Sequence, residues 1–380
     1  MKIEQSLWTS KSGWSSQPTE ELKDAAQVAF VFGATNVLSD KKIIDDIRRT
    51  YPRAYLMGCS TAGEIFGTRV LDGSLVVTAV AFEHSFVKGA SVRLSEAGSI
   101  RAAGERLAGL IEKEGLVHAF VLSDGLKVNG TELVKGLTQC LPDTIAVTGG
   151  LAGDGTQFLK TLVFSEGYPE RDTIAILGLY GDRLKVGYAS MGGWDPFGPE
   201  RQITRSEGNV LYELDGKSAL DLYKKYLGEH ARGLPASAMF FPLSIRTTER
   251  KAGVVRTILS VNEGDQSMTF AGDIPVRGYA RFMKANCERL IDGATGAAST
   301  SFQAIGSVSP DLAILISCVG RKLVLRQRIE EESEGVRDIL GDKTALTGFY
   351  SYGEISPFTP GAECELHNQT MAITTISEKK

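Results

Sequence analysis

A strand–helix–strand unit that closes in a glycine turn recurs three times along the 380-residue chain. Its opening strands read AFVFG (29–33), AFVLS (119–123) and AILIS (313–317). Its closing segments read STAGE (60–64), GLAGD (150–154) and YSYGE (350–354). The opening alanine and the closing glycine are 34 residues apart in the first two copies and 40 in the third. Long unlike segments separate the copies, which indicates a repeated supersecondary unit and not a solenoid.

The remaining pattern is typical of an α/β protein, because short β-branched runs alternate with amphipathic stretches. Pro196 and Pro199 lie in a glycine-rich, charged segment, 195–216, which we expect to contain a boundary. We therefore predict two subdomains, 25–215 and 216–376, each made of mixed β-sheets flanked by helices. The other elements that the pattern predicts are strands at 28–36 and 54–65, a hairpin or strand pair at 75–94, and helices after Ser39, over 99–113 and around 281–305. The acidic segment 329–338 is predicted to be a solvated loop or helix start.

Composition excludes several classes of function. The net charge of −4 and the pI near 5.8 argue against nucleic acid as a partner. No window approaches 18 consecutive apolar residues, so we expect no membrane span, and the first residues lack an apolar run of signal-peptide length. Five widely spaced cysteines without a CxxC motif fit a reducing cytoplasm.

Acidic residues follow the three glycine turns: Glu64, Asp154 and Glu354. A carboxylate at such a place can simply accept hydrogen bonds from nearby backbone N–H groups. It can also line the crevice beyond the carboxyl ends of the strands, where α/β proteins bind ligands. The first role is the commoner one for any single turn, and the repetition of the acid adds weight to the second.

Nucleophilic catalysis has two candidate residues. GCSTAG (58–63) resembles a nucleophile elbow, but G-x-S-x-G requires glycine where Ala62 stands. Ser60 could still be exposed on the turn, and Cys59 is the better nucleophile if its pKa is lowered. None of the four histidines has a sequence signature that links it to either residue. A cysteine- or serine-dependent enzyme therefore stays only an alternative.

Phosphate and metal motifs are incomplete. GGLAGDG (149–155) lacks the Lys-Ser/Thr of a P-loop, and Cys364 and His367 would face opposite sides of a strand, which disfavours zinc. One histidine in an apolar pocket is enough to hold a b-type haem. His367, in a segment with strand alternation, is the best placed of the four. Cys318 ends an apolar strand beside Arg321, so it is either a thiolate favoured by that cation or a buried small hydrophobe.

These residues together resemble the FIST family, bacterial sensory modules with an N-terminal and a C-terminal FIST domain. The matching segments are GCSTAGEI (58–65), SDG…NG (123–130), GGLAGDG (149–155), ISCVGRK (316–322), GFYSYGEISP (348–357) and ELHNQTM (365–371). They occur in the family's order and cover the chain from about 25 to 376. The resemblance assigns the segment 25–215 to a FIST N-like domain and 216–376 to a FIST C-like domain.

The resemblance implies a ligand-sensing role. Stand-alone members of this length are similar to the nitric-oxide-sensing haem proteins of the NosP type, which act on a separate histidine kinase or cyclic-di-GMP enzyme. On that basis His367 is the expected proximal ligand of the haem iron. Tyr352 and Cys318 are the other expected cofactor-binding residues. Nitric oxide would weaken the iron–histidine bond, and the strand that carries His367 could then shift and change affinity for the partner.

The rival hypothesis is a haem-free sensor of an amino-acid-like molecule, which the family resemblance also implies. In it, polar side chains of the closing turns form a pocket that holds the amino group of a zwitterion. The ligand-binding residues expected in this pocket are Cys59, Ser60, Glu64, Asp154, Ser351, Tyr352 and Glu354. A homodimer is compatible with either hypothesis.

Overall fold

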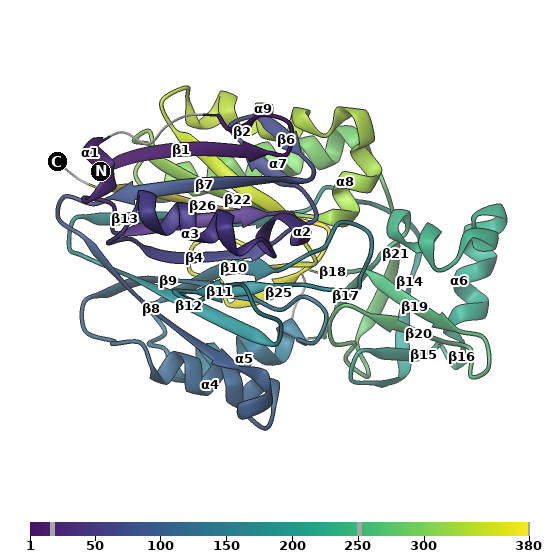
Figure 1. Cartoon of the computed structure of the whole chain (residues 1–380). Coiled ribbons are helices and arrows are strands. Elements are labelled where there is room, and N and C mark those ends of the chain that lie inside the picture. Colours follow the sequence, from purple (N-terminus) through teal and green to yellow (C-terminus); the bar gives the residue numbers. More distant parts are fainter. Residues whose placement is uncertain (16–19, 249–252, 379–380) are drawn as a thin grey trace.

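The computed structural model describes residues 1–15, 20–248 and 253–378. Within these ranges the strands form three six-stranded sheets and one eight-stranded sheet, and the main helices lie on the outside of the six-stranded sheets (Figure 1). The α/β class, with mixed sheets and flanking helices, is therefore confirmed. No helix in the described ranges is both long enough and apolar enough to cross a bilayer.

The first sheet is built on the first copy of the repeat. Its parallel central strands are β3 (Val28–Gly33) and β4 (Tyr55–Ser60), joined through α3 (Lys41–Thr50). The other elements of this unit are β1 (Lys2–Thr9), β2 (Gly13–Trp14), β7 (Ser74–Ala81), α1 (Glu20–Lys23) and α2 (Thr35–Leu38). The sheet order is β11-β4-β3-β7-β1-β2, so β11 (Val163–Ser165) enters it from the second unit.

Helix α3 shows how the sequence sets a local element. Its buried face consists of Ile43, Ile44 and Ile47, as the spacing predicts. The N-cap is Asp40, whose carboxylate accepts a hydrogen bond from the Lys42 N–H at 2.9 Å. Ser39 was the expected cap, but its hydroxyl donates to the Thr35 carbonyl and ends the preceding turn instead.

The second sheet repeats this plan in the order β25-β24-β10-β9-β12-β8. Its parallel strands are β9 (Leu116–Ser123) and β10 (Ala146–Leu151), connected by α5 (Gly130–Cys140). Ser99 caps α4 (Ile100–Gly109), which packs beside α5, so the helix predicted at 99–113 is confirmed. The remaining elements are η1 (Leu94–Glu96), β8 (Phe86–Arg93) and β12 (Thr173–Tyr180) of this unit, with β24 (Gly353–Pro357) and β25 (Cys364–His367) from the third.

The third sheet has the order β13-β26-β22-β23-β5-β6. Its parallel strands are β22 (Leu312–Cys318) and β23 (Ala345–Ser351). Its antiparallel strands are β13 (Leu184–Met191), β26 (Met371–Glu378), β5 (Glu64–Phe66) and β6 (Arg69–Leu71). The associated helices are α7 (Cys287–Ala304), α8 (Val319–Leu325), η4 (Arg326–Arg328) and α9 (Glu330–Leu340).

The three units exchange strands in a closed cycle. The strand that follows each closing turn leaves its own unit and pairs with the second parallel strand of a neighbour: β5 with β23, β11 with β4, and β24 with β10. The second and third sheets therefore draw strands from both halves of the chain, whereas the first is built from strands within residues 2–165. The threefold repeat seen in the sequence is the repeat of these sheets.

A glycine at one register position recurs in all three units. Gly58, Gly149 and Gly348 each lie in the second parallel strand. They pair with the third residue of the opening segments that begin at Ala29, Ala119 and Ala313: Val31, Val121 and Leu315. A Cβ atom at these glycines would lie 2.1, 1.8 and 1.8 Å from a carbonyl oxygen of that neighbouring strand. Because a backbone atom cannot move aside as a flexible side chain does, the close approach of the two strands requires glycine here.

The inner faces of the three sheets meet in one apolar core. Phe30, Phe120 and Ile314 occupy equivalent positions in the opening strands and belong to the same buried cluster. The rings of Phe30 and Phe120 are 5.6 Å apart in an edge-to-face arrangement, and those of Phe32 and Phe349 are 4.8 Å apart. The space between the three sheets is thus filled with side chains. None of the cavities described here lies in it.

The segment 75–94 is not a hairpin. It forms β7 and β8, but β7 pairs with β1 and β3 in the first sheet, whereas β8 pairs with β12 in the second. The chain crosses between two sheets at Phe82–Ser85. A turn pattern in the sequence shows where the chain changes direction but not which strand each arm pairs with.

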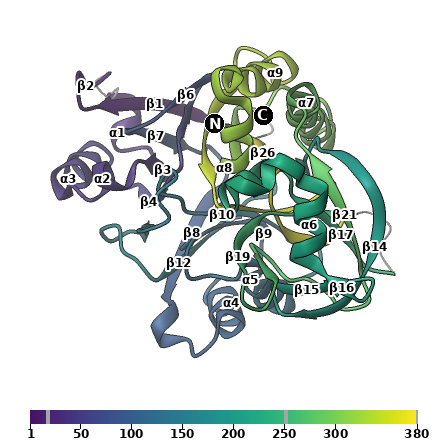
Figure 2. The same cartoon turned by 90° about the vertical axis from the view of Figure 1, so that its right-hand side faces the viewer.

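Residues 195–248 and 253–284, here called the insert, contain the eight-stranded sheet and project from one end of the three-sheet core (Figures 1 and 2). The segment 195–216, expected to hold a boundary, supplies its first strands, β14 (Asp195–Glu207) and β15 (Val210–Leu214). α6 (Ala219–Leu227) packs on this sheet through Leu220 and Tyr223. The other elements are β16 (Lys217–Ser218), η2 (Gly228–Gly233), η3 (Ala236–Phe240), β17 (Leu243–Arg246), β18 (Val254–Arg256), β19 (Ile258–Asn262), β20 (Ser267–Phe270) and β21 (Tyr279–Lys284).

Candidate functional site

The three closing turns meet at one end of the core, as the repeat predicts. The Gly153 N–H donates to the Ser60 carbonyl at 2.9 Å, and the Tyr350 N–H donates to the Gly63 carbonyl at 2.8 Å. Gly353 pairs with Leu151 of the second unit. The contact is tight, since a Cβ atom at Gly153 would lie 2.9 Å from the Ala62 nitrogen. The turns therefore form a packed junction, and none of the cavities described here is lined by their residues.

Glu64 is buried at this junction and accepts hydrogen bonds from its own unit. The Thr61 hydroxyl donates to one carboxylate oxygen, and the Ser74 N–H and hydroxyl donate to the other at 3.1 and 2.6 Å. Burial raises the pKa of Glu64 to about 7 in spite of these bonds. The carboxyl group thus fixes the turn to the start of β7.

Glu354 makes the same set of bonds in the third unit. The Ser351 hydroxyl donates to one oxygen at 2.7 Å, and the Thr370 N–H and hydroxyl donate to the other at 3.1 and 2.9 Å. Burial raises the pKa of Glu354 to about 8. Glu64, Ser351 and Glu354 were expected to contact a ligand, but each is engaged with its own turn.

Asp154 is not the third member of this set. Phe349, Gly150 and Cys59 are equivalent positions of the second parallel strands. Glu64 pairs with Phe349 and Glu354 pairs with Gly150, but the residue that pairs with Cys59 is Val163. The Asp154 carboxylate instead accepts N–H bonds from three successive residues of the loop after it, at 2.9, 2.7 and 2.7 Å. The alignment of the three turns on their last glycine is one residue out of register in the second copy, because Gly153 follows Gly149 by four residues, whereas Gly63 and Gly353 follow their equivalent glycines by five. A loop then separates Gly153 from β11.

The two candidate nucleophiles are fully buried. Desolvation raises the pKa of the Cys59 thiol well above its usual value, so the thiol stays protonated. The Ser60 hydroxyl oxygen accepts a hydrogen bond from the Leu162 N–H at 2.8 Å. Among the described residues, no histidine hydrogen-bonds either side chain, so the geometry does not favour an acyl-transfer enzyme.

Cys318 and Tyr352 are also committed to the core. Burial, followed by the negative charge of Glu354, raises the pKa of the Cys318 thiol, which supports the buried-hydrophobe interpretation over the thiolate. The Tyr352 hydroxyl donates to Asp154, and its ring stacks on Phe158 at 4.5 Å.

His367 lies in β25, as its strand pattern predicts, but it does not offer a nitrogen to a haem in this arrangement. The side chain is fully buried, and Nε2 lies 2.7 Å from the Ser356 carbonyl oxygen. The Phe358 ring is 4.2 Å from the imidazole, and His367 lines none of the described cavities. The residues around His367 therefore do not fit a haem without rearrangement.

A buried ion pair supports the third unit, and the sequence pattern missed it. Arg321 and Glu332 have side chains with no exposed surface and are joined at 2.6 Å. The Ser317 and Tyr350 hydroxyls donate to Glu332 at 3.0 and 2.7 Å, and Arg321 also donates to two backbone carbonyls. The segment 329–338, expected to be solvated, is mostly helix α9, and Glu332 faces inward from it.

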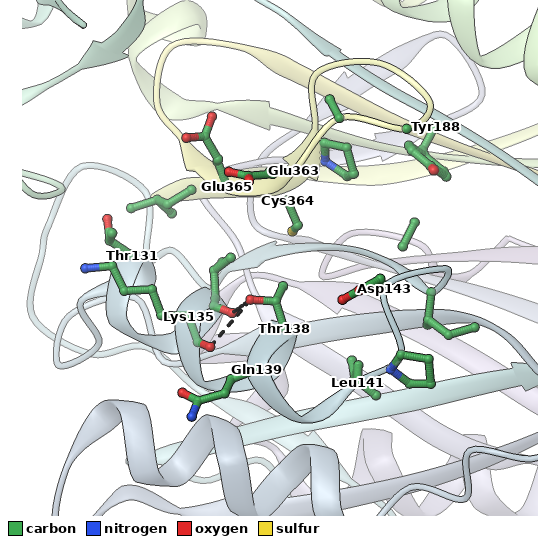
Figure 3. A pocket seen from close by; sticks show the side chains of 18 of the residues that line it. Thr131, Lys135, Thr138, Gln139, Leu141, Asp143, Tyr188, Glu363, Cys364 and Glu365 are labelled. Carbon is green, nitrogen blue, oxygen red and sulfur yellow. Dashed lines mark hydrogen bonds between the residues drawn. The ribbon is translucent and has the colours of Figure 1, made fainter. Parts of the chain in front are cut away.

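The largest described cleft lies elsewhere, between α5, the β24–β25 loop and the insert. Its first lobe has a volume of about 1020 Å³ and is bounded by α5 and the loop after it on one side and by residues 361–366 on the other. In Figure 3, Thr131, Lys135, Thr138 and Gln139 of α5 lie across this space from Cys364 and the acidic residues on either side of it.

A second lobe of about 500 Å³ lies against the insert. Thr131, Lys135, Arg256 and Glu365 line both lobes and form a waist between them; we call the two lobes together the joint cleft. Arg256 comes from β18 of the insert, so the three-sheet core and the insert both contribute walls. Of the candidate residues expected from the sequence, none lines this cleft.

Both signs of charge border the joint cleft. Arg101, Lys135 and Arg256 supply cations to the first lobe, and Asp143, Glu363 and Glu365 supply carboxylates. The Lys135 ammonium donates to the carboxylates of Glu132 at 2.7 Å and Asp273 at 3.3 Å. The hydrogen bond to Glu132 is the main cause that raises the pKa of Lys135 and keeps it charged. The apolar floor consists of side chains such as Val134, Leu141, Ile145 and Leu366.

Sequence reasoning missed the waist residues for a topological reason. Thr131 and Lys135 lie on the helix of the second repeat, whereas Arg256 lies in a hairpin-rich stretch far along the chain. The position of the insert over α5 brings them together, and no local spacing encodes it. Glu365 is the first residue of the ELHNQTM segment (365–371), but nothing in the pattern distinguished it.

Fold and cleft define a class of protein: an α/β protein of three strand-exchanged sheets with an insert that borders a polar cleft. Two family models match the chain, the FIST N domain over residues 27–217 and the FIST C domain over residues 219–357. The chain belongs to the FIST family, whose domains are sensory and bind small ligands.

Individual relatives are distant. The chain is 26% identical over 230 residues to the uncharacterised protein MJ1623 of Methanocaldococcus jannaschii; the match spans 56% of this chain and 44% of that protein, less than half of its length. Among solved structures, it resembles a chorismatase (10% identity, TM-score 0.36, 99% and 98% of the two chains). It also resembles a cyanuric acid hydrolase from A. caulinodans (8% identity, TM-score 0.39, 100% and 99%). At these scores the activities of the two enzymes do not bear on this chain.

Proposed function

We propose that the protein is a sensor whose small-molecule ligand, an amino-acid-like zwitterion or a somewhat larger molecule with both charges, binds in the joint cleft. The observation that carries this proposal is the meeting of two lobes at a waist of four residues, Thr131, Lys135, Arg256 and Glu365. Ligand binding there bridges the core and the insert, and a bridging ligand can change their relative arrangement.

The size of the cleft supports a small organic ligand. Ligand pockets in proteins are about 300–1,000 Å³. The lobe beside α5 has a volume of about 1020 Å³ and the lobe beside the insert about 500 Å³. A free amino acid would fill only part of this space, so larger zwitterions and short peptides belong in the same ligand class.

The charges support a ligand with both signs. A carboxylate can reach the Arg256 guanidinium and Lys135 at the waist, and an ammonium group can reach Glu363 or Asp143 in the first lobe. Guanidinium groups bind carboxylates in a planar, bidentate manner, which favours the carboxylate end at Arg256. The ligand pocket expected at the closing turns is thus replaced by one at the joint cleft.

Haem-based sensing of nitric oxide is the second hypothesis, and it comes from the family resemblance. The buried state of His367, with Nε2 2.7 Å from the Ser356 carbonyl oxygen, does not favour it. An absorption spectrum of protein purified with added haemin decides the point. A Soret band that shifts with nitric oxide and is lost in His367→Ala would favour haem over the zwitterion.

For signal output, the family resemblance favours a separate partner protein in either hypothesis. The two family models account for residues 27–217 and 219–357, and neither is a kinase or cyclase model. A histidine kinase or a cyclic-di-GMP enzyme remains the expected partner from the resemblance, and a homodimer is compatible with it. Pull-down with candidate kinases, with and without ligand, would identify the partner.

The joint cleft is tested by ligand screening with a filled-cleft variant. Thermal unfolding and calorimetric titration are measured with the amino acids, their decarboxylated and deaminated analogues, and di- and tripeptides. We expect zwitterions to stabilise the wild-type protein and the single-charge analogues to bind at least about tenfold more weakly.

Thr138→Trp places an indole in the first lobe, and Cys140→Trp places the same side chain on an exposed position two residues further along α5 that does not line the cleft. We expect the Thr138 variant to lose binding and the Cys140 variant to keep it. Equal binding by both variants, or stabilisation by no member of the panel, would refute the proposal.

A further inference from the structure

We propose that Gln369 is a positioning residue that fastens the insert wall of the joint cleft to the core and thereby holds Arg256 at the waist. This inference rests on the proposed function, because it assigns Gln369 its effect through a ligand that Arg256 binds. Gln369 itself does not line the cleft.

Two successive residues of the insert bond to one short segment of the core. The Arg256 guanidinium donates from Nη1 to the Leu366 carbonyl at 2.8 Å. The Gln369 side-chain amide donates from Nε2 to the Thr257 hydroxyl at 3.0 Å. Both bonds are buried, and they fix the end of β18 at two points, so the guanidinium cannot rotate freely.

Gln369 also contacts the place where the insert begins. The Trp194 indole N–H donates to the Gln369 carbonyl at 2.9 Å, and Trp194 immediately precedes β14. One residue of the core thus bonds to the insert at its entry and at its cleft wall. We call these two bonds, together with the Arg256–Leu366 bond, the latch.

The space for the Gln369 side chain is reserved by the core. A Cβ atom at Gly320 would lie 2.3 Å from Gln369 Nε2, so any larger residue at position 320 would displace the amide. The backbone of Gln369 has φ of 64°, in the left-handed region that non-glycine residues seldom occupy. Such conformations persist where the surrounding structure holds them and are frequent at functional sites.

The latch is incompletely satisfied. Gln369 Oε1 and both polar atoms of the Asn368 side chain are buried and have no hydrogen-bond partner among the described residues. Gln369 Nε2 also donates to the Met239 carbonyl of the insert at 3.5 Å, so replacing Gln369 by leucine removes two hydrogen bonds and one unpaired oxygen together. The folded state should therefore tolerate Gln369→Leu, and a loss of ligand affinity in this variant would report on positioning.

A double-mutant cycle on the full-length protein tests the latch. The variants are Gln369→Leu, Thr257→Val and their combination, with Gln303→Leu on the exposed face of α7 as the matched control. The probe is the panel member that stabilises the wild-type protein most. We expect each single variant to bind it about tenfold more weakly, the double variant to bind no more weakly than either, and Gln303→Leu to bind as the wild type does.

Hydrogen–deuterium exchange supplies a readout that needs no ligand. We expect backbone amides of residues 254–258 to exchange faster in Gln369→Leu than in Gln303→Leu, while the unfolding temperature stays within a few degrees. Unchanged affinity, additive losses in the double variant, or unchanged exchange would overturn the latch. If the wild-type protein bound no panel member but exchange still rose in Gln369→Leu, the proposed ligand would be wrong and the latch would stand.

Discussion

Glu64 and Glu354 lie in different units yet accept equivalent sets of three hydrogen bonds. One comes from the hydroxyl of the residue three positions earlier, Thr61 or Ser351. The other two come from the N–H and the hydroxyl of Ser74 or Thr370, at the start of β7 or just before β26. Each carboxyl thereby joins a closing turn to the antiparallel strand of its own unit. The second unit has Val163 at this position and no such bonds. The repeat therefore preserves the fold while two of its three copies keep a buried acid.

Stability should depend on pH through these two acids. Their pKa values in the folded protein, about 7 and about 8, lie above the ordinary value of 4.5, so the folded state binds protons more tightly than the unfolded state. The stability that they contribute is complete below about pH 4.5 and is lost as pH rises through 7 and 8. We expect the free energy of unfolding to fall over this range by about 3–5 kcal/mol for each group.

Glu64→Gln and Glu354→Gln keep the shape and the accepting oxygen but cannot ionise. Denaturant unfolding at pH 5 and pH 8 should show a smaller difference in these variants than in the wild type. An identical pH dependence in the double variant would show that the two carboxyls are ionised throughout and that the assigned pKa direction is wrong.

The close strand approach at Gly149 should not tolerate a methyl group. Because a Cβ atom there would lie 1.8 Å from the Val121 carbonyl oxygen, we expect Gly149→Ala to destabilise the protein by about 3 kcal/mol or more. Gly109 in α4 has no atom within 4 Å of its Cβ position, so Gly109→Ala should be neutral or stabilising by up to about 1 kcal/mol. Chemical denaturation distinguishes the two, and equal stability would contradict the close approach.

Removing one partner of the Arg321–Glu332 pair should be costly. The partner left behind would be a buried charge without a counter-ion, so we expect Glu332→Gln to lower the free energy of unfolding by about 3–5 kcal/mol. Glu288→Gln breaks an exposed ion pair with Arg328 and should change stability little. Thermal unfolding of the two variants under the same buffer checks this difference; a similar effect of both would argue against burial of the pair.

The loop after Gly153 should depend on one carboxylate. Asp154 accepts three successive backbone N–H bonds and the Tyr352 hydroxyl, so we expect Asp154→Ala to cost about 1–3 kcal/mol and to expose residues 155–161 to proteases. Limited proteolysis with mass spectrometry locates the first cut. Asp182→Ala, at an exposed turn, serves as the control, and the same cleavage pattern in both would refute this role.

The sequence predicted the repeated unit well because its signals are local. The opening strands and the closing glycine turns, and the buried face of α3, follow from hydrophobic periodicity and glycine position. The crossing of β7 and β8 into different sheets, and the shift of register at Gly153, were not predictable, because strand pairing is decided by distant parts of the chain.

The candidate site was predicted less well for a related reason. The sequence shows Glu64 and Glu354 as charged residues beside turns. In the structure both side chains are buried and accept hydrogen bonds within their own units. The residues of the joint cleft gave no local signal, since the arrangement of the insert over α5 brings Lys135 and Arg256 together. A lone histidine such as His367 has the same sequence signature whether it binds a metal or a backbone carbonyl.

The exchange of β5, β11 and β24 among the three units also bears on how this chain can be divided or lost. A fragment that ends between two units would lack a strand that one of its sheets receives from the other part. It would also carry an exchanged strand without the strand that it pairs with, so neither part should fold by itself. The core is then expected to unfold in a single cooperative transition. The boundary between the two family matches, near residue 218, is therefore not a place where the chain can be divided into independently folding parts.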